Sequence, residues 1–129
     1  MFGAPSRPRG AYARYSEVDV AARVEGASPH GLIVILLEEL LKALDTMAAA
    51  ERSGDRTRSA AVQSRALSLL HALESGLDFN RGGEIAGALA KIYREARRLL
   101  VTGAADREAV IRQARTMIAD IAEAWGAIG

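Results

Sequence analysis

The sequence predicts an all-α protein: an antiparallel up-down-up-down four-helix bundle preceded by a mobile N-terminal segment. Half of the 129 residues are hydrophobic and only 5% are aromatic, which is typical of helices rather than of strands. Apolar residues recur at three- and four-residue spacing in four segments. Loops of a few residues join these segments, and short loops make consecutive helices antiparallel neighbours. We expect residues 1–27 to form the N-terminal segment and residues 28–129 to form the bundle.

The first predicted helix, Pro29 to Arg52, is the longest and the most apolar. Ser28 supplies an N-cap hydroxyl, and Pro29 stands at the first helical position, where its missing N–H costs nothing. Residues 32–37 are all apolar. They cover the whole circumference of the helix, although a bundle helix needs an apolar stripe of only about 100°. Some apolar residues therefore lie outside the core stripe, and further helices or a partner must cover them: Leu32, Ile35 and Leu41.

The second helix is predicted from about Thr57 to Phe79. Gly54 suits a left-handed C-terminal cap for the helix before it, and Asp55 suits an N-cap. The run Asn80-Arg81-Gly82-Gly83 is a helix breaker that ends the second helix.

The third helix is predicted to start near Glu84, whose carboxylate complements the positive end of a helix, and to end at Thr102. Asp106 is the predicted N-cap of the fourth helix. Near the end of that helix, Trp125 has two interpretations. The first is a core plug between helix ends, and the second is the wall of a groove that contacts a ligand.

The composition argues against several classes of function. Lys and Arg together number 17 against 16 Asp and Glu, so the basic stripe of a nucleic-acid-binding domain is not expected. No apolar run approaches the about 20 residues that span a bilayer, and residues 1–14 lack the apolar region of a secretory signal. Cysteine is absent, which fits a reducing compartment. We expect a cytoplasmic protein without nucleic-acid binding or membrane insertion.

No catalytic or metal-binding pattern is predicted. The histidines, His30 and His71, lack the glutamate three residues earlier that a di-iron bundle uses. Ser28 has no visible base and orienting acid, and N-capping accounts for it. We therefore expect no enzyme, no cofactor, no metal and no small-molecule substrate.

Several motifs resemble the FliS family, the flagellar export chaperones for flagellin. The run from Val24 to Ile33 is similar to the signature of that family's first helix, and Tyr15 to Val18 matches its Tyr-x-x-Val pattern. The resemblance covers about residues 11–128. Further matches follow in the family's order and spacing: Ser53-Gly54-Asp55, Leu77-Asp78, Gly82-Gly83-Glu84-Ile85-Ala86, Leu89, Ile92-Tyr93 and Ala124-Trp125. Two positions depart from the pattern, Arg14 where Ala is frequent and Glu95 where an aromatic residue is frequent.

This resemblance implies a helical bundle without catalytic activity. It implies binding of the disordered C-terminal segment of flagellin, which becomes helical as it wraps the bundle. It further implies that the protein prevents premature flagellin polymerisation and delivers flagellin to the export gate of the flagellar type III apparatus. The resemblance further implies that the N-terminal segment with the Tyr-x-x-Val pattern covers or borders the binding surface and engages the gate.

We expect partner-binding residues on the first helix, in the grooves beside the next two helices, and in the N-terminal segment. A core role remains the more direct interpretation for Leu36 and Leu70. Tyr15 and Val18 either belong to a frayed tail or lie on the bundle. The alternative function is a non-catalytic regulatory module that self-associates or binds another motility partner. The expected residues are Tyr15, Val18, Leu32, Ile35, Leu36, Leu70 and Tyr93.

Overall fold

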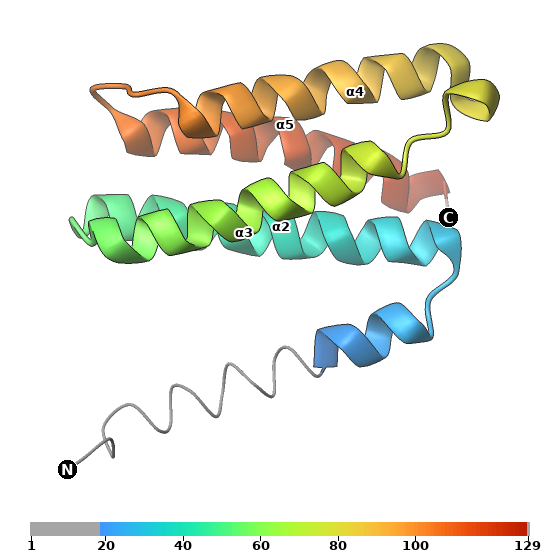
Figure 1. The fold of residues 1–129 in the computed structure, drawn as a ribbon, viewed down its shortest axis with the longest axis horizontal. Helices are drawn as coiled ribbons and strands as arrows, with labels where there is room; N and C mark the ends of the chain where they lie inside the picture. The colour runs from blue at the N-terminus through green and yellow to red at the C-terminus, as the bar shows by residue number, and fades with distance from the viewer. Residues whose placement is uncertain (1–18, 129) are drawn as a thin grey trace. The chain divides into compact units, whose positions relative to one another are not determined.

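A computed structural model describes residues 19–128 (Figure 1). Residues 19–25 are helical, and four long helices follow; no strand occurs in this range. The described residues thus hold five helical segments, one more than the sequence predicts. The expected site residues Tyr15 and Val18 lie outside the described residues. The long helices are α2 (Pro29–Arg52), α3 (Arg56–Ser75), α4 (Phe79–Val101) and α5 (Arg107–Ile128).

The chain divides into two compact units, residues 1–35 and 36–129, and each is described by itself. In the first unit, Ser28 starts helix α2. Its hydroxyl oxygen accepts a hydrogen bond from the Gly31 N–H at 3.1 Å, and its carbonyl accepts one from the Leu32 N–H at 2.8 Å. The predicted N-cap at Ser28 and the predicted start at Pro29 are confirmed.

In the second unit, polar contacts join α2 to α3. Arg65 of α3 donates a hydrogen bond to Glu39 of α2 at 3.1 Å. The hydroxyl of Ser59, earlier on α3, donates to the carboxylate of Glu51, later on α2. Residue numbers therefore rise along α2 as they fall along α3.

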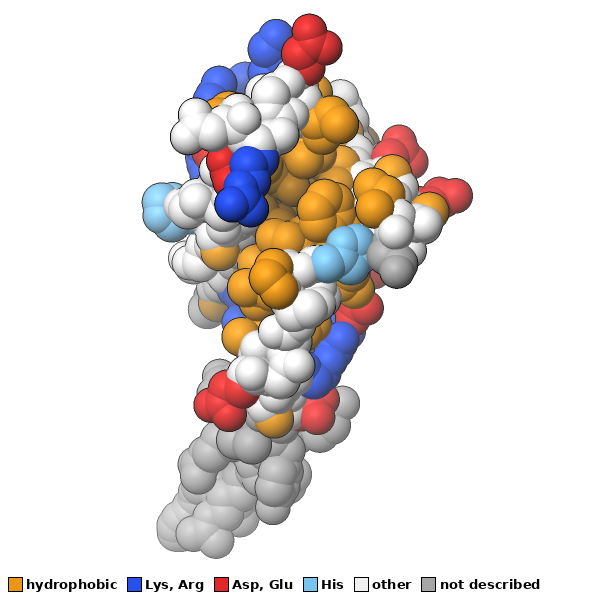
Figure 2. Space-filling view, turned by 90° about the vertical axis from the view of Figure 1, so that its right-hand side faces the viewer, with side chains coloured by type: hydrophobic (Ala, Val, Ile, Leu, Met, Phe, Trp, Pro, Cys, Tyr) orange, Lys and Arg blue, Asp and Glu red, His pale blue; other side chains and the backbone are white. Residues whose placement is uncertain are grey.

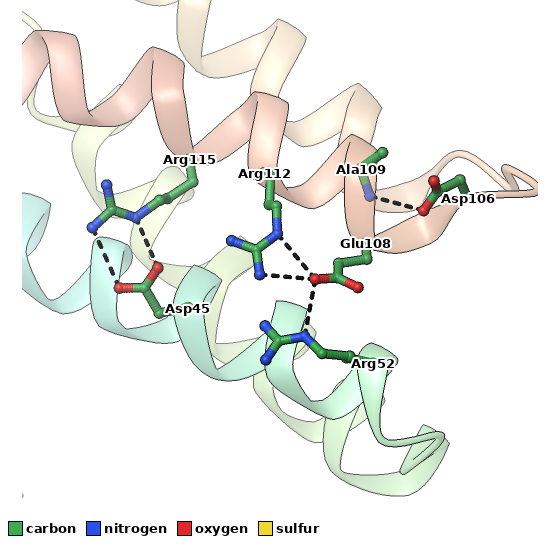
Figure 3. Close-up of polar contacts among 7 residues, drawn as sticks. All are labelled: Asp45, Arg52, Asp106, Glu108, Ala109, Arg112 and Arg115. Atoms are coloured by element: carbon green, nitrogen blue, oxygen red, sulfur yellow. Dashed lines mark hydrogen bonds and ion pairs between the residues drawn. The ribbon is translucent and has the colours of Figure 1, made fainter.

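The same order holds between α2 and α5 (Figure 3). Arg115 of α5 donates to Asp45 of α2 at 2.7 Å, and Arg52 of α2 donates to Glu108 of α5 at 3.1 Å. Glu108 precedes Arg115 on α5, whereas Arg52 follows Asp45 on α2. These two pairs lie along the same side of α5.

Helix α4 packs against α3 on one side and against α5 on the other, and Figure 1 shows α4 running alongside α5. Each long helix therefore has two neighbours within the second unit. All four contribute large side chains that are fully buried: Leu37, Leu40, Leu44, Met47, Leu70, Leu73, Tyr93, Leu100, Ile111 and Ile118.

The capping residues Gly54, Asp55 and Asp106 behave as predicted. Gly54 has a φ of 76°, in the left-handed region that favours glycine. Asp55 accepts a hydrogen bond from the Arg58 N–H, and Asp106 accepts one from the Ala109 N–H, both at 3.0 Å. Among the described residues, no helix combines the length and the hydropathy that a membrane crossing requires.

The predicted junction between the second and third helices is wrong. Helix α3 ends at Ser75, and α4 already begins at Phe79. The cause is Asp78, whose carboxylate accepts hydrogen bonds from the Asn80 N–H at 3.1 Å and the Arg81 N–H at 3.2 Å. This N-cap starts a helical turn inside the supposed breaker. The break occurs at Gly83, where φ is 50° and ψ is −121°, so the glycine kinks α4 instead of ending α3.

Candidate partner-binding groove

A hollow of about 430 Å³ lies between α4 and α5. We call it the α4–α5 groove. Its lining is apolar apart from one carboxylate, which belongs to Asp120. The residues that line it are Ile85, Leu89 and Ile92 of α4, and Met117, Asp120, Ile121, Ala124, Trp125 and Ile128 of α5.

The α4 wall exists because this helix carries two adjacent apolar stripes. Its buried core positions include Ala86, Ala90 and Tyr93. The groove positions Ile85, Leu89 and Ile92 each precede one of these by one residue. One residue is a rotation of about 100° around a helix of 3.6 residues per turn. The groove stripe therefore lies beside the core stripe, on the side that faces α5.

The α5 wall follows the same periodicity. Met117, Ile121, Trp125 and Ile128 recur at intervals of three or four residues, so they share one face of the helix. Trp125 is half-buried and lines the groove, in agreement with the groove-wall interpretation of this residue and not with a fully enclosed plug.

The groove opens where α4 begins and α5 ends. Ile85 is 71% exposed and Ile128 is 74% exposed, values that are unusual for isoleucine. Figure 2 shows hydrophobic side chains gathered on this face around a hollow. Contiguous apolar surface of this kind is typical of a binding site for another protein.

On the side of α5 away from the groove, ion pairs join this helix to α2. Figure 3 shows Glu108 accepting hydrogen bonds from both Arg112 and Arg52, at 2.8 and 3.1 Å. These two donors lower the pKa of Glu108. The paired charges Glu108, Arg112 and Arg115 of α5 thus lie beside α2, whereas the face towards α4 is apolar apart from Asp120.

A second ionic contact involves the buried carboxylate of Glu39. Burial, the largest single influence, raises its pKa, but the hydrogen bonds and charges of Lys42 and Arg65 outweigh burial. The pKa of Glu39 is therefore lowered, and the group remains ionised at neutral pH. It joins α2 to α3 and has no part in the groove.

The expected site residues occupy varied environments. Leu70 is 0% exposed and Tyr93 is 2% exposed, and burial raises the pKa of the tyrosine. Leu36 is half-buried. None of these three residues of the second unit lines the α4–α5 groove.

In the first unit, Leu32 is half-buried and Ile35 is 6% exposed. The six-residue apolar run of α2 therefore does not present all its members to solvent. The exposed apolar surface that the sequence analysis assigned to α2 is found most clearly between α4 and α5.

Most of the groove was not predicted from the sequence: among the residues that line it, Trp125 alone had a groove-wall interpretation, and none was an expected site residue. A signal was present in the consecutive apolar pairs Ile85-Ala86, Leu89-Ala90 and Ile92-Tyr93. Paired positions repeated at helical spacing indicate an apolar face wider than one core stripe. The pattern does not say which member of each pair faces the core.

Comparison with known proteins agrees with the resemblance. Residues 11–129 match the family described as "Flagellar protein FliS". The chain is 34% identical over 113 residues to the flagellar secretion chaperone FliS of Salmonella typhimurium, covering 86% of this chain and 84% of that protein. It is 25% identical over 116 residues to the flagellar secretion chaperone FliSB of Pseudomonas aeruginosa, covering 89% of this chain and 92% of that protein.

Proposed function

Because the chain belongs to the FliS family of flagellar proteins, we propose that it is a cytoplasmic, non-catalytic export chaperone for flagellin. It binds the disordered C-terminal segment of flagellin, prevents premature polymerisation and delivers the cargo to the flagellar type III export gate. The observation that carries this proposal is the α4–α5 groove, an apolar surface with exposed isoleucines at its open end.

The proposal includes the topology of the scaffold: α2 to α5 form an antiparallel up-down-up-down bundle. The reversed order of the polar contacts supports it: Glu39 and Glu51 of α2 contact Arg65 and Ser59 of α3. Likewise, Asp45 and Arg52 of α2 contact Arg115 and Glu108 of α5. Such a bundle places α4 between α3 and α5 and gives the groove two rigid walls.

The walls favour a helical guest. Both α4 and α5 satisfy their backbone N–H and C=O groups internally, so the groove offers no sheet edge to an extended strand. A guest in an apolar groove must then satisfy its own backbone, which a helix does. Residues Ile85 to Ile92 extend about 10 Å along α4, and Met117 to Ile128 extend about 16 Å along α5. Two to three turns of an amphipathic helix match this length.

The energetics suit a chaperone that must release its cargo. Coupled folding and binding commonly buries about 1,000–3,000 Å² and spends about 2–5 kcal/mol on ordering the guest. The ordering cost moderates the affinity that the apolar contact provides. Release at the export gate then requires less work than separation of two preformed domains.

We propose lesser roles for the other expected residues. Leu32, Ile35 and Leu36 provide apolar surface on α2 for the cargo. Leu70 and Tyr93 are buried in the core and stabilise the helices that form the binding surface. Tyr15 and Val18, which lie outside the described residues, border the cargo surface. The two half-buried leucines, Leu32 and Leu36, have the exposure that such contacts need.

A matched pair of variants tests the groove. Ile85→Asp places a charge on the α4 wall, whereas Val101→Asp places one at an exposed valine of the same helix that does not line the groove. We expect Ile85→Asp to abolish binding of the C-terminal flagellin segment, and Val101→Asp to bind as the unmodified chain does. Both variants should retain their helical circular dichroism, because both side chains are exposed.

Trp125 provides the readout. It is the one tryptophan of the chain and it lines the groove, so burial by the guest should shift its fluorescence emission to shorter wavelength. A cargo segment without tryptophan keeps the signal specific. Equal binding by the Ile85→Asp and Val101→Asp variants would show that the cargo does not use this groove.

A further inference from the structure

The lining of the α4–α5 groove contains one charged residue. Charged residues close to the lining in the sequence include Glu84 and Lys91 of α4 and Asp120 and Glu123 of α5. Of these four, only Asp120 lines the groove. The apolar hollow therefore has a single fixed charge, and it is negative.

Several acidic residues of the second unit form ion pairs with arginines, and Asp120 is not one of them. Asp45 is paired with Arg115, and Glu108 is paired with Arg52 and Arg112. Among the residues that the structure describes, none forms a hydrogen bond or ion pair with Asp120. Asp120 is an exposed residue.

The surroundings of Asp120 are apolar. Met117 precedes it by three residues and Ala124 follows it by four, so both lie next to it on the helix surface. Both also line the groove. A lysine or arginine of a guest has a hydrocarbon stem that can lie on such side chains while its charged end reaches a carboxylate.

We propose that Asp120 is a specificity-determining residue, which pairs with a lysine or arginine at the edge of the guest helix's apolar face. This inference rests on the proposed function. Apolar contacts repeat every turn, so they distinguish poorly between registers that differ by one turn of the guest. A single charge-assisted hydrogen bond forms in one register and one direction only. The pairing thereby fixes how the cargo lies in the groove.

The same carboxylate discriminates against other helices. A guest with Asp or Glu at the corresponding position meets a like charge beside an apolar surface, where repulsion is less screened than in water. An amphipathic helix of equal hydrophobicity but acidic edges should therefore bind more weakly than one with a basic edge.

The test is a charge reversal with a matched control. Asp120→Lys reverses the charge that lines the groove, and Glu123→Lys reverses an exposed acid one turn away that does not line it. We expect Asp120→Lys to weaken binding of the C-terminal flagellin segment about tenfold, as reversal of a specific contact does, and Glu123→Lys to change it less than about twofold. Within residues 19–128, neither variant removes an ion pair that the structure shows.

The cargo provides the second half of the test. Each lysine and arginine of the flagellin segment is reversed to glutamate in turn, and every variant is titrated against the unmodified chain, Asp120→Lys and Glu123→Lys. One cargo reversal should weaken binding to the unmodified chain and restore binding to Asp120→Lys. That compensation identifies the partner of Asp120, because a general change in net charge acts equally on Glu123→Lys.

The outcomes separate the two proposals. Equal effects of Asp120→Lys and Glu123→Lys, with Ile85→Asp still abolishing binding, overturn the pairing and leave the groove as the cargo site. Absence of binding to the unmodified chain, or full binding to Ile85→Asp, overturns the proposed function and the pairing with it.

Discussion

Arg115 and Asp45, 70 residues apart in the chain, form a two-point ion pair with distances of 2.7 Å from Nε and 3.3 Å from the second guanidinium nitrogen. The pair joins α5 to the second half of α2 (Figure 3). It agrees with the rotation of α5 that buries Ile111, Ala114 and Ile118, because the planar guanidinium meets the carboxylate at two points. With this face turned to α2, the stripe that contains Met117, Ile121 and Ile128 is directed at α4, and the groove results.

Acid should destabilise the fold through three glutamates whose pKa is lowered: Glu39, Glu74 and Glu108. For Glu74 the main cause is the hydrogen bond from Arg97. A carboxyl with a lowered pKa in the folded state contributes stability above its unfolded pKa, which is about 4.3 for glutamate. That stability is lost as the pH falls through the lower folded pKa. Urea unfolding at pH 7 and at pH 3 should therefore give a smaller free energy of unfolding at pH 3.

Glu39→Gln measures how much the buried carboxylate of Glu39 contributes to this pH dependence of the free energy of unfolding. The variant should lose about 1–2 kcal/mol at pH 7, because the charge-assisted bonds to Lys42 and Arg65 are weakened. It should lose less between pH 7 and pH 3 than the unmodified chain does. An identical pH dependence in both proteins would contradict the role of Glu39.

Core and groove positions should respond differently to truncation. Leu70→Ala removes a fully buried side chain and should lower the free energy of unfolding by about 2–5 kcal/mol. Ile85→Ala removes a side chain that is already largely in water, so the cost should be below about 0.5 kcal/mol. Denaturant unfolding of both variants measures the contrast. A large loss for Ile85→Ala would show that this residue belongs to the core.

Gly83 should resist replacement. Its φ of 50° and ψ of −121° lie in a region that L-residues rarely adopt, so Gly83→Ala should cost about 1–3 kcal/mol. Gly87 on the same helix is the control. A Cβ added there meets no atom within 4 Å, and Gly87→Ala should stabilise the helix by about 0.5–1 kcal/mol. The two midpoints of thermal unfolding should therefore move in opposite directions, and a shift of both in the same direction would contradict the kink at Gly83.

Arg107 should contribute more stability than a typical surface arginine. Its guanidinium donates to the carbonyls of Leu100 and Thr102, at 2.7 and 3.2 Å, and to the side chain of Gln63 at 2.9 Å. Arg107→Met leaves carbonyls at the end of α4 without this donor and should cost about 1–3 kcal/mol. Arg112→Met breaks only an exposed pair with Glu108 and should cost less than about 1 kcal/mol. Equal losses in urea unfolding would argue against this role of Arg107.

Local signals account for the parts of the fold that the sequence predicted. The N-cap at Ser28 and the glycine at Gly54 delimit α2, and both act through bonds or dihedral angles of neighbouring residues. The start of α4 at Phe79, after Asp78, was not predicted because two local signals compete there. Both a cap and a double glycine were present, and the hydrogen bonds of the aspartate decided where the helix starts.

The site was less predictable because it depends on how helices face one another. The periodicity of apolar residues does not distinguish Ile92 from Tyr93. In the structure, however, Tyr93 is buried and Ile92 lines the groove. The difference arises from the rotation of α4 against α3 and α5, which distant contacts determine. The excess of apolar residues was visible in the sequence, but its location between α4 and α5 was not.

Isothermal titration of the full chain with the C-terminal segment of flagellin, repeated at several temperatures, tests the central claim most directly. We predict a one-to-one complex with favourable enthalpy, a negative heat-capacity change and a gain of helical circular dichroism, which together indicate a guest that folds as apolar surface is buried. Absence of heat at every temperature, together with unchanged Trp125 fluorescence, would contradict the claim that this chain carries flagellin in an apolar groove.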